Sequence, residues 1–494
     1  MNPPSKRLSR RAFVVQSTKV VTFIAAIAAL LGGLSGLGAE STAVHQATGV
    51  KVGEVTDLSA IVWMRLTAAP LRNNAGEVVK GHIGGNAAPK PVPTEPAKLE
   101  GACPGTPGQV RVRYGTHEDL SGAKSTDWAE VSSRADFAHQ FLLTGLQPAT
   151  TYFFASETAG PGGSPRHGAL RGRFETAPTP TQVSEITFCV VTGQMYADLD
   201  HIDGFNIYPA MAKLNPKYVV FTGDNVYYDS EEPRAVTPAL ARYHWERMYS
   251  LPRHVDLLRH VASYWEKDDH DTWENDSWPG LKSQRMGEFK FSEGQRIFLE
   301  QVPMGGSIYR TFRCGKLLQI WLTDGRDFRS PNNQPDGPEK TIWGREQKEC
   351  LKRTLKESDA TWKVIVSPTP IVGPDRGNKN DNHANKGFRH EGDEIRAWLQ
   401  SHVPDNCFVV CGDRHWQYHS VNPQTELHEF SVGPASDEHA AGSPGFDAEY
   451  HKFHRVKGGF LSVTVGAKEG GNSIRFQHRD VHGNVVYDWA KNLP

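Results

Sequence analysis

Residues 217–229 read KYVVFTGDNVYYD, and this stretch decides the fold. The apolar run before Gly223 is typical of a strand buried on both faces of a sheet, and Gly-Asp ends it in a turn. Ligands of α/β proteins bind beyond the carboxyl ends of such strands, so we expect Asp224 at the edge of a site. Its two carboxylate oxygens can bridge two cations. Tyr227, three residues on, can return to the same site as a tyrosinate ligand suited to ferric iron.

The same pattern recurs along the chain. We interpret apolar runs as strands at residues 186–193, 317–324, 362–367 and 407–413, and helical patterns lie at 204–214, 343–357 and 392–403. Strands that alternate with helices predict an α/β fold. We therefore expect a layered domain, with central sheets and flanking helices, over residues 185–494.

An acidic segment lies between the strand at residues 217–224 and the strand at residues 317–324. Residues 267–276, KDDHDTWEND, hold five carboxylates, one histidine and one asparagine. A charge run is usually a solvated loop, but Trp265, Trp273 and Trp278 indicate that this one is partly buried. Buried carboxylates need counter-ions, and metal cations supply them. The segment therefore indicates a metal site.

Two further polar segments follow strands. In DGRDFRS, residues 324–330, Arg326 and Arg329 can bind phosphate oxygens, or they can hold neighbouring acids in structural ion pairs. In GDRHW, residues 412–416, Asp413 and His415 present a hard oxygen and an imidazole, which are ligand types of a mixed metal site. Both interpretations of the arginines stay open at this point.

Together, GDNVYYD, DDHDTWEND, DGRDFRS and GDRHW resemble the ordered motif series of the PhoD-like alkaline phosphatases, a branch of the metallophosphatases. The resemblance implies a layered metallophosphoesterase-type catalytic domain that uses iron with calcium. The metal ligands that it implies are Asp224, Tyr227, Asn275, Asp413 and His415. It also implies functional roles for the acidic residue and the histidine of the DDH motif, Asp269 and His270.

One departure from this family concerns the end of the first catalytic strand. The family has Ser-Cys-Gln there, with the Cys on iron, whereas this chain has Thr-Gly-Gln with Gly193 in the middle. Cys189 lies four residues earlier in the strand, too far to substitute. The identity of the metal is therefore open, and an oxygen of Asp198, Asp200 or water is the expected replacement.

The residues before the catalytic domain read as short strands and turns. Alternating segments at 49–55, 59–66, 109–114 and 138–143 are strand-like, and a Gly- and Pro-rich stretch at 71–107 predicts a long loop. LQPATTY, residues 146–152, matches the tyrosine corner of fibronectin type III sandwiches, in which the Tyr hydroxyl ties a strand to the preceding loop. We expect an all-β sandwich over residues 46–178, and it resembles the domain that precedes PhoD-like catalytic domains.

The N-terminus predicts export. SRRAFV, residues 9–14, is a twin-arginine pattern, and an uncharged apolar stretch at 20–34 follows it. A membrane anchor is the alternative, but the run is short and Gly-rich for a span of about 20 residues. We predict a twin-arginine signal peptide over residues 1–43, with the twin-arginine export machinery as a partner. The mature protein is then periplasmic or secreted and keeps no stable membrane span.

Net charge and cysteine content bear on the kind of ligand and on disulfide bonding. The formal net charge of -1 argues against a nucleic-acid binder with a broad basic face. A small-molecule phosphate ester held at a local metal site stays compatible with it. The six cysteines show no CxxC pair, and a disulfide or two stays open after export. Cys407 and Cys411 stand too far apart on one strand to bond, so we expect buried thiols there.

These observations lead to one functional hypothesis. We expect metal-dependent hydrolysis of phosphoric esters by metal-activated water, of the alkaline phosphatase D type. His270 would protonate the leaving alkoxide or orient the phosphate, and Arg326 would assist. Asn382 and His383 would contact the leaving group, or they belong to a polar surface loop. Two alternatives stay open: a phosphodiesterase or phospholipase-type hydrolase using the same site, and a catalytically altered binding protein of the envelope.

Overall fold

The structure is a computed structural model of the chain. It describes residues 43–493, apart from 85–86, 88–91, 93–94, 164–165 and 469–470. All but the last residue of the predicted signal peptide lies outside the described residues. The described helices are α1 (Ile207–Ala212), α2 (Pro238–Tyr249), α3 (Pro252–Leu258), α4 (Phe291–Gln301), α5 (Gly344–Glu357) and α6 (Arg389–His402).

The strands fall into an N-terminal, a central and a C-terminal set. The N-terminal strands are β1 (Val50–Gly53), β2 (Ser59–Arg65), β3 (Gly108–Gly115), β4 (Lys124–Ser125), β5 (Ala129–Val131), β6 (Ala138–Thr144), β7 (Thr151–Ala159) and β8 (Arg166–Glu175). The central strands are β9 (Ile186–Val191), β10 (Tyr218–Thr222), β11 (Ala262–Glu266), β12 (Arg310–Cys314), β13 (Leu318–Leu322), β14 (Trp362–Ser367) and β15 (Cys407–Cys411). The C-terminal strands are β16 (Gln417–Val421), β17 (His428–Ser431), β18 (His451–Arg455), β19 (Phe460–Lys468), β20 (Gly471–Arg479) and β21 (Val485–Leu493).

Two large sheets hold most of the described strands. Among the described residues, one runs β21-β20-β19-β9-β10-β11-β1-β2-β6 and the other β12-β13-β14-β15-β17-β16-β18. β9, β10 and β11 are parallel, and so are β13, β14, β15 and β17. The carboxyl ends of the parallel strands in each sheet therefore point the same way, which brings the segments that follow them to one edge.

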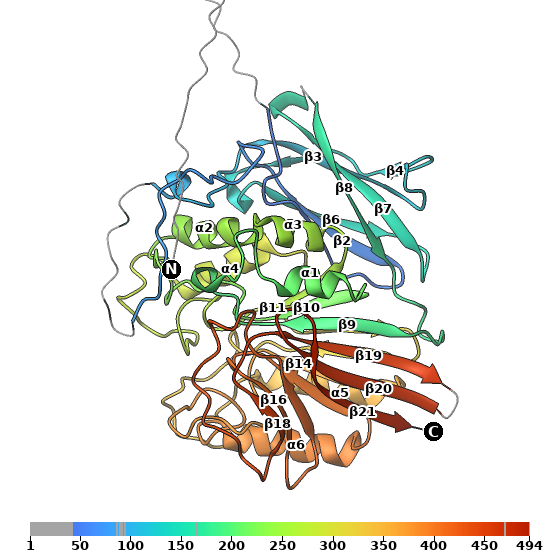
Figure 1. The fold of residues 1–494 in the computed structure, drawn as a ribbon, viewed down its shortest axis with the longest axis vertical. Coiled ribbons are helices and arrows are strands. Elements are labelled where there is room, and N and C mark those ends of the chain that lie inside the picture. Colours follow the sequence, from blue (N-terminus) through green and yellow to red (C-terminus); the bar gives the residue numbers. More distant parts are fainter. Residues whose placement is uncertain are drawn as a thin grey trace, which may run out of the picture. The chain divides into compact units, whose positions relative to one another are not determined.

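Alternate side chains of the parallel strands build the layers. Val220 of β10 and Val364 of β14 share the core in which the two sheets face each other. Val219 packs instead with α1 to α4, and Ile365 packs with α5 and α6. Successive strand residues point to opposite faces, so a continuous apolar run means burial on both sides. Helices thus cover the outer face of each sheet (Figure 1), and the predicted layered α/β fold is confirmed.

The N-terminal strands divide between two sheets. β4-β3-β7-β8 form a separate sheet with β5 beside β3, whereas β2 and β6 join the large sheet through β1. The link is parallel pairing of β1 with β11, at Gly53 opposite Ser263. The predicted tyrosine corner forms, because the Gln147 N–H donates to the Tyr152 hydroxyl at 2.9 Å. One layer of the N-terminal β-structure is therefore continuous with the catalytic sheet.

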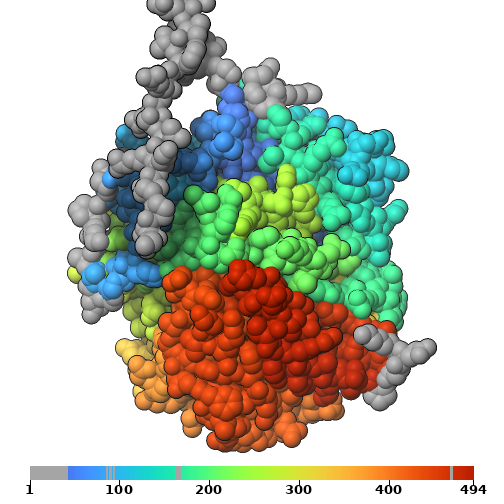
Figure 2. All heavy atoms as spheres, viewed as in Figure 1, coloured from blue at the N-terminus to red at the C-terminus, as the bar shows by residue number. Residues whose placement is uncertain are grey.

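The C-terminal strands complete both sheets. β19 pairs antiparallel with β9, and β20 and β21 extend that edge. Figure 2 shows these late residues, in orange and red, together on one lower face, away from the early residues in blue and cyan. The burial of β20 alternates along the strand, as expected for an antiparallel strand with one wet face.

Local sequence signals explain where α2 begins and which face of α5 is buried. Thr237 caps α2 by accepting from the Leu240 N–H at 3.3 Å, and Pro238 occupies the first turn, where its missing N–H costs nothing. α5 buries Gln347, Leu351 and Leu355, one turn apart, against the second sheet. The other side of α5 is charged and faces water.

The cysteines do not pair. All six lie in the described part of the chain as free thiols, so the open disulfide hypothesis is corrected, and Cys407 and Cys411 are buried as expected. Cys189 lies in the apolar core under the helices, where burial raises the pKa of its thiol to about 12. The described helices are all too short or too polar to cross a lipid bilayer.

Candidate metal centre

Asp224 lies in a tight turn directly after β10. Gly223 and Asp224 have φ values of 79° and 52°, in the left-handed region that glycine adopts most readily. A Cβ at Gly223 would lie 2.5 Å from the Cβ of Asp268, so only glycine allows the two segments to approach this closely. The turn therefore places the Asp224 carboxylate against the acidic segment that follows β11.

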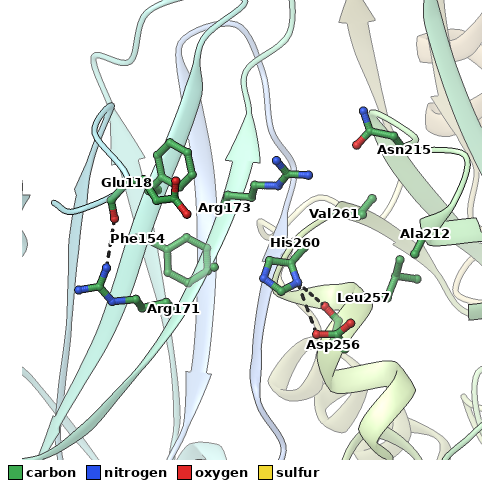
Figure 3. A pocket seen from close by; sticks show the side chains of 12 residues that line it. Glu118, Phe154, Arg171, Arg173, Ala212, Asn215, Asp256, Leu257, His260 and Val261 are labelled. Carbon is green, nitrogen blue, oxygen red and sulfur yellow. Dashed lines mark hydrogen bonds and ion pairs between the residues drawn. The ribbon is translucent and has the colours of Figure 1, made fainter. Parts of the chain in front are cut away.

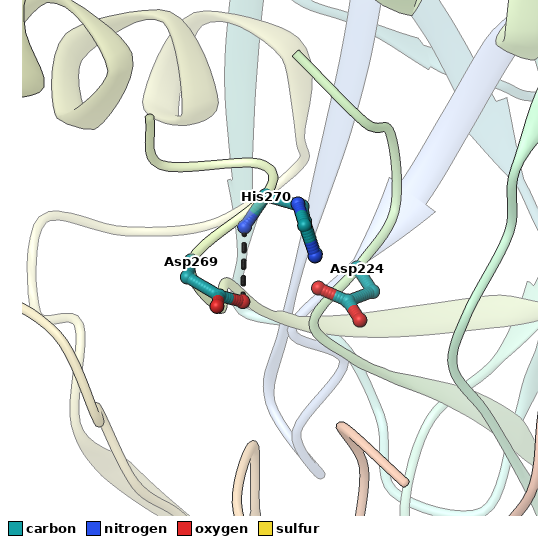
Figure 4. Close-up of side chains that lie close together, drawn as sticks. All are labelled: Asp224, Asp269 and His270. Carbon is teal, nitrogen blue, oxygen red and sulfur yellow. Dashed lines mark hydrogen bonds between the residues drawn. The ribbon is translucent and has the colours of Figure 1, made fainter. Parts of the chain in front are cut away.

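Two groups of possible metal ligands share Asp224. One joins it to Asp269 and His270, and the other joins it to Asp268 and Asp413, with the ligand atoms of each group within 4.8 Å of one another. Figure 4 shows the His270 ring directed toward Asp224, with the His270 N–H donating to Asp269. Asp413 follows β15 in a second left-handed turn, with φ of 60°. Asp224 is thus common to both groups.

Single oxygens of the buried carboxylates in these groups lack hydrogen-bond partners. Among the described residues, Asp224 Oδ1 and Asp268 Oδ2 are buried and have no hydrogen-bond partner. Burial raises the pKa of Asp224 well above its ordinary value, and Asp269 and Asp268 raise it further against the opposing effect of His270. Burial raises the pKa of Asp268 to about 6 although Arg326 lies beside it. Unpaired buried carboxylates of this kind fit divalent or trivalent cations.

Tyr227 connects Asp224 to two histidines from distant parts of the chain. Its hydroxyl lies 3.1 Å from Asp224 Oδ2, 3.2 Å from His415 Nε2 and 2.8 Å from His439 Nε2. Burial raises the pKa of Tyr227 well above its ordinary value, and Asp224 adds to the shift. Burial lowers the pKa of His415, so its ring is neutral and able to act as a ligand. A phenol oxygen, a carboxylate and two imidazoles therefore converge on one point.

His270 is oriented by a carboxylate that the sequence did not single out. Its Nδ1 lies 2.6 Å from Asp229 Oδ1. Burial alone would lower the pKa of His270, but Asp229 and Asp269 outweigh that effect and hold the pKa well above its ordinary value. Asp229 also accepts from the Asn275 N–H at 3.0 Å. The arrangement keeps the ring protonated and fixes its direction.

Arg326 is occupied by acids. Its side chain is fully buried, it pairs with Asp268, and its Nη2 lies 3.6 Å from Asp269 Oδ1. Arg329 is also buried and donates to the carbonyl oxygen of Asp381. Of the two interpretations of these arginines, the contacts favour structural ion pairing. Arg326 holds the acidic segment in place beside Asp224.

Three other candidates lie away from this cluster. The Asn275 side chain is exposed, and the residue contacts this region through its backbone N–H. Asn382 and His383 are fully buried, so they do not belong to a surface loop. Asn382 donates to Asp375 at 2.8 Å, and His383 Nε2 lies 3.0 Å from Glu391. These side chains are engaged in structural contacts.

The surroundings of Gly193 contain the residues that the sequence was least able to predict. A Cβ at Gly193 would lie 3.1 Å from Pro434 and 3.5 Å from the His439 ring. His439 Nδ1 lies 2.8 Å from Asp198 Oδ2, and Asp198 Oδ1 lies 2.7 Å from His82 Nε2. Asp198 is thus near the site, as expected, but it contacts His439, whereas Asp200 accepts from the Asn206 N–H. No local pattern marks His439, which stands in an ordinary loop after β17.

A second candidate is a surface pocket lined by arginines, a histidine and apolar side chains. It lies between β7 and β8 on one side and the end of α3 on the other, and Figure 3 shows Arg171, Arg173, Asp256 and His260 around it. His260 interacts with Asp256, and Arg171 donates to the Glu118 carbonyl. None of the predicted site residues lines this pocket. The acidic cluster at the strand ends is therefore the better candidate for a functional site.

Family models match both halves of the chain. The model of PhoD-like phosphatase matches residues 188–484, and that of the PhoD-like phosphatase N-terminal domain matches residues 34–178. Alkaline phosphatase D of Bacillus subtilis (strain 168) is 24% identical over 418 residues, or 74% of this chain and 64% of that protein. The chain therefore spans less than two thirds of the length of this relative.

Solved structures share the fold. The structure of PhoD has a TM-score of 0.66 at 17% identity and covers 90% of this chain and 88% of its own. A purple acid phosphatase from yellow lupin (Lupinus luteus) seeds has a TM-score of 0.59 at 12% identity, covering 90% of this chain and 74% of its own. Both likenesses confirm the predicted metallophosphoesterase-type architecture.

Proposed function

The chain belongs to the PhoD-like phosphatase family, and from this premise we propose that it hydrolyses phosphoric esters with the help of bound cations. The observation that carries the proposal is the double position of Asp224, which contacts Tyr227 and lies 3.8 Å from His415 on one side and belongs to a group of buried carboxylates with Asp268 and Asp413 on the other. A carboxylate in this position can bridge two cations. The same observation argues against a binding protein that has lost turnover, because the acids are present and buried oxygens of Asp224 and Asp268 have no hydrogen-bond partner.

The donor atoms suggest which cations would bind. Tyr227 and His415, with Asp224, offer a phenol oxygen, an imidazole and a carboxylate, which suit iron. Asp268 and Asp413, again with Asp224, offer only carboxylate oxygens, which suit calcium. When bound, the cations would activate a water molecule and neutralise charge on the phosphate. We therefore retain iron with calcium as the proposed pair.

The protein's own residues would handle the proton of the leaving group. Asp229 occupies Nδ1 of His270, so Nε2 is the atom left to face a substrate. A protonated imidazole in that position can donate to the departing alkoxide oxygen. Asp229 is then a positioning residue, and Arg326 keeps Asp268 and Asp269 in place. Nothing in these contacts assigns Arg326 a direct bond to phosphate.

We also propose that the chain is exported and that residues 1–43 are a twin-arginine signal. The support is the twin-arginine pattern at residues 9–14 and the apolar stretch that follows. The proposed mature chain then consists of the N-terminal β-domain, residues 46–178, and the catalytic domain, residues 185–494.

A substrate panel tests the function. Wild type, Asp224→Asn and Asp256→Asn would be assayed on p-nitrophenyl phosphate and bis(p-nitrophenyl) phosphate, with and without chelator. Asp256 is a matched control, because its side chain is 65% exposed on α3. We expect Asp224→Asn and chelation each to lower the rate by more than about 100-fold, and the preferred ester to separate monoesterase from diesterase activity. A native rate in Asp224→Asn would refute the proposal.

A further inference from the structure

The Tyr227 hydroxyl has a spacing to its neighbours that fits a shared cation. Asp224 Oδ2, His415 Nε2 and His439 Nε2 lie 3.1, 3.2 and 2.8 Å from it. Adjacent ligands of an ion with bonds of about 2.0–2.2 Å stand roughly 2.8–3.6 Å apart, from octahedral to tetrahedral geometry. The three distances from the hydroxyl fall in that interval, and Asp224 Oδ2 and His415 Nε2 lie 3.8 Å apart, so an ion beside the hydroxyl would need these side chains to move only slightly toward it.

Hydrogen bonding alone satisfies this group poorly. The hydroxyl has one proton to donate. A neutral His439 that donates from Nδ1 to Asp198 has a bare lone pair on Nε2, and the Asp224 carboxylate also needs a donor. When the Asp224 carboxyl is ionised, two acceptors compete for one proton at 2.8 and 3.1 Å. A cation in place of that proton satisfies the phenol oxygen, the carboxylate and the imidazole together.

Asp198 holds His439 in the way that carboxylates hold metal-binding histidines. Its Oδ2 lies 2.8 Å from His439 Nδ1, which directs Nε2 toward Tyr227. The other ring nitrogen of a metal-ligating histidine is nearly always bonded to a carboxylate or carbonyl in this manner. His82 in turn contacts the second oxygen of Asp198 at 2.7 Å.

The backbone at Gly193 lies beside the His439 ring. The Ala435 N–H donates to the Gly193 carbonyl at 3.1 Å, which fixes the loop that carries His439 against the end of β9. A side chain at position 193 would start 3.5 Å from the ring and 3.1 Å from Pro434. The ring itself is 7% exposed. The His439 ring therefore lies in van der Waals reach of position 193.

We propose that His439, held by Asp198, is a ligand of the cation that Tyr227, His415 and Asp224 bind. The proposal rests on the metal-dependent function proposed above. Two imidazoles beside a phenolate select a transition metal such as iron over calcium, because calcium prefers ligand sets made of oxygen alone. His439 thus adds a second imidazole beside Tyr227.

Iron binding tests this assignment without relying on activity. Wild type, His439→Ala, His439→Gln, Asp198→Asn and His260→Ala would be loaded with iron and dialysed. Iron per chain would be measured by mass spectrometry, and the phenolate-to-iron(III) absorption band by visible spectroscopy. His260 is the control, because it is a partly exposed histidine that contacts Asp256. Thermal unfolding of each variant would show whether it is folded.

We expect His439→Ala and His439→Gln to lose at least tenfold in iron affinity and to shift the band, and Asp198→Asn to lose about 10- to 100-fold. Added imidazole should restore iron to His439→Ala, and His260→Ala should match wild type. If the folded His439 variants keep wild-type affinity and the same band, His439 is not a ligand and this inference fails alone. If wild type itself retains no metal, the proposed function fails with it.

Discussion

Removing the carboxylate that orients His270 should damage catalysis selectively. In Asp229→Asn, the charge-assisted contact of 2.6 Å between Oδ1 and His270 Nδ1 becomes a neutral one. A hydrogen bond to a charged group is worth about 1.5–3 kcal/mol. If that energy is lost in the transition state, kcat falls roughly 10- to 150-fold. KM should change little, because Asp229 is buried behind His270 and does not face the substrate.

The choice of ester makes this prediction specific. A proton donor matters most when the leaving alkoxide is strongly basic, and least when it is a stable phenolate. The kcat of Asp229→Asn should therefore fall much more on an alkyl or phenyl phosphate than on p-nitrophenyl phosphate. Asp256→Asn, an exposed position, is the matched control. An equal loss on all esters, in a variant with native thermal stability, would refute the role of His270 as a proton donor.

Three predictions concern stability. Arg326→Met should destabilise the metal-free protein by about 3–5 kcal/mol in urea unfolding, because Asp268 is left as an unpaired buried charge. Gly294→Ala should cost at least about 1–3 kcal/mol, because a Cβ there would overlap the Thr272 carbonyl oxygen and push α4 off the acidic segment. Burial would raise the pKa of Glu391, but its hydrogen bonds lower it from 4.5 to about 2. Its stabilisation is therefore complete above about pH 4.5 and lost toward pH 2, so Glu391→Gln should remove about 3 kcal/mol of the acid sensitivity measured between pH 6 and pH 2.

Each of these has an outcome that would contradict it. Arg326→Met with native stability would mean that Asp268 is neutral or solvated. Gly168→Ala is the control for Gly294→Ala, since a Cβ at Gly168 would meet nothing within 4 Å, and equal stability of the two variants would contradict the packing. An acid profile that is identical in wild type and Glu391→Gln would show that the hydrogen bonds to Glu391 contribute nothing.

The sequence predicted best what is local. The apolar run that ends in Asp224 specifies a buried strand and a turn, and the run that ends in Asp413 does the same, so each acid could be placed at the carboxyl end of its strand. The tyrosine corner was also a local pattern, and Tyr152 forms it. The continuation of the catalytic sheet through β1 was not predicted, because which strands pair depends on contacts between residues about 210 positions apart.

The site was predicted only in part, because several of its contacts join residues that are far apart in the sequence. Asp229 stood in a quoted motif, but only its contact with His270, 41 residues away, gives it a role. His439 has no motif at all, and it reaches Asp198 from 241 residues away. Asn275 shows the reverse, since a residue next to the right motif can face water when the turn directs its side chain outward. The sequence could not predict contacts between residues that are far apart in the chain, nor the direction in which a turn points a side chain.

The central claim is that acids and imidazoles from separate strand ends hold cations around Asp224. The most direct measurement is an anomalous difference map from crystals of protein purified without chelator. We predict peaks within about 2.0–2.6 Å of the Asp224 oxygens, one of them beside Tyr227 and another beside Asp268. A map without a peak in this cluster, from protein that is active, would contradict the account.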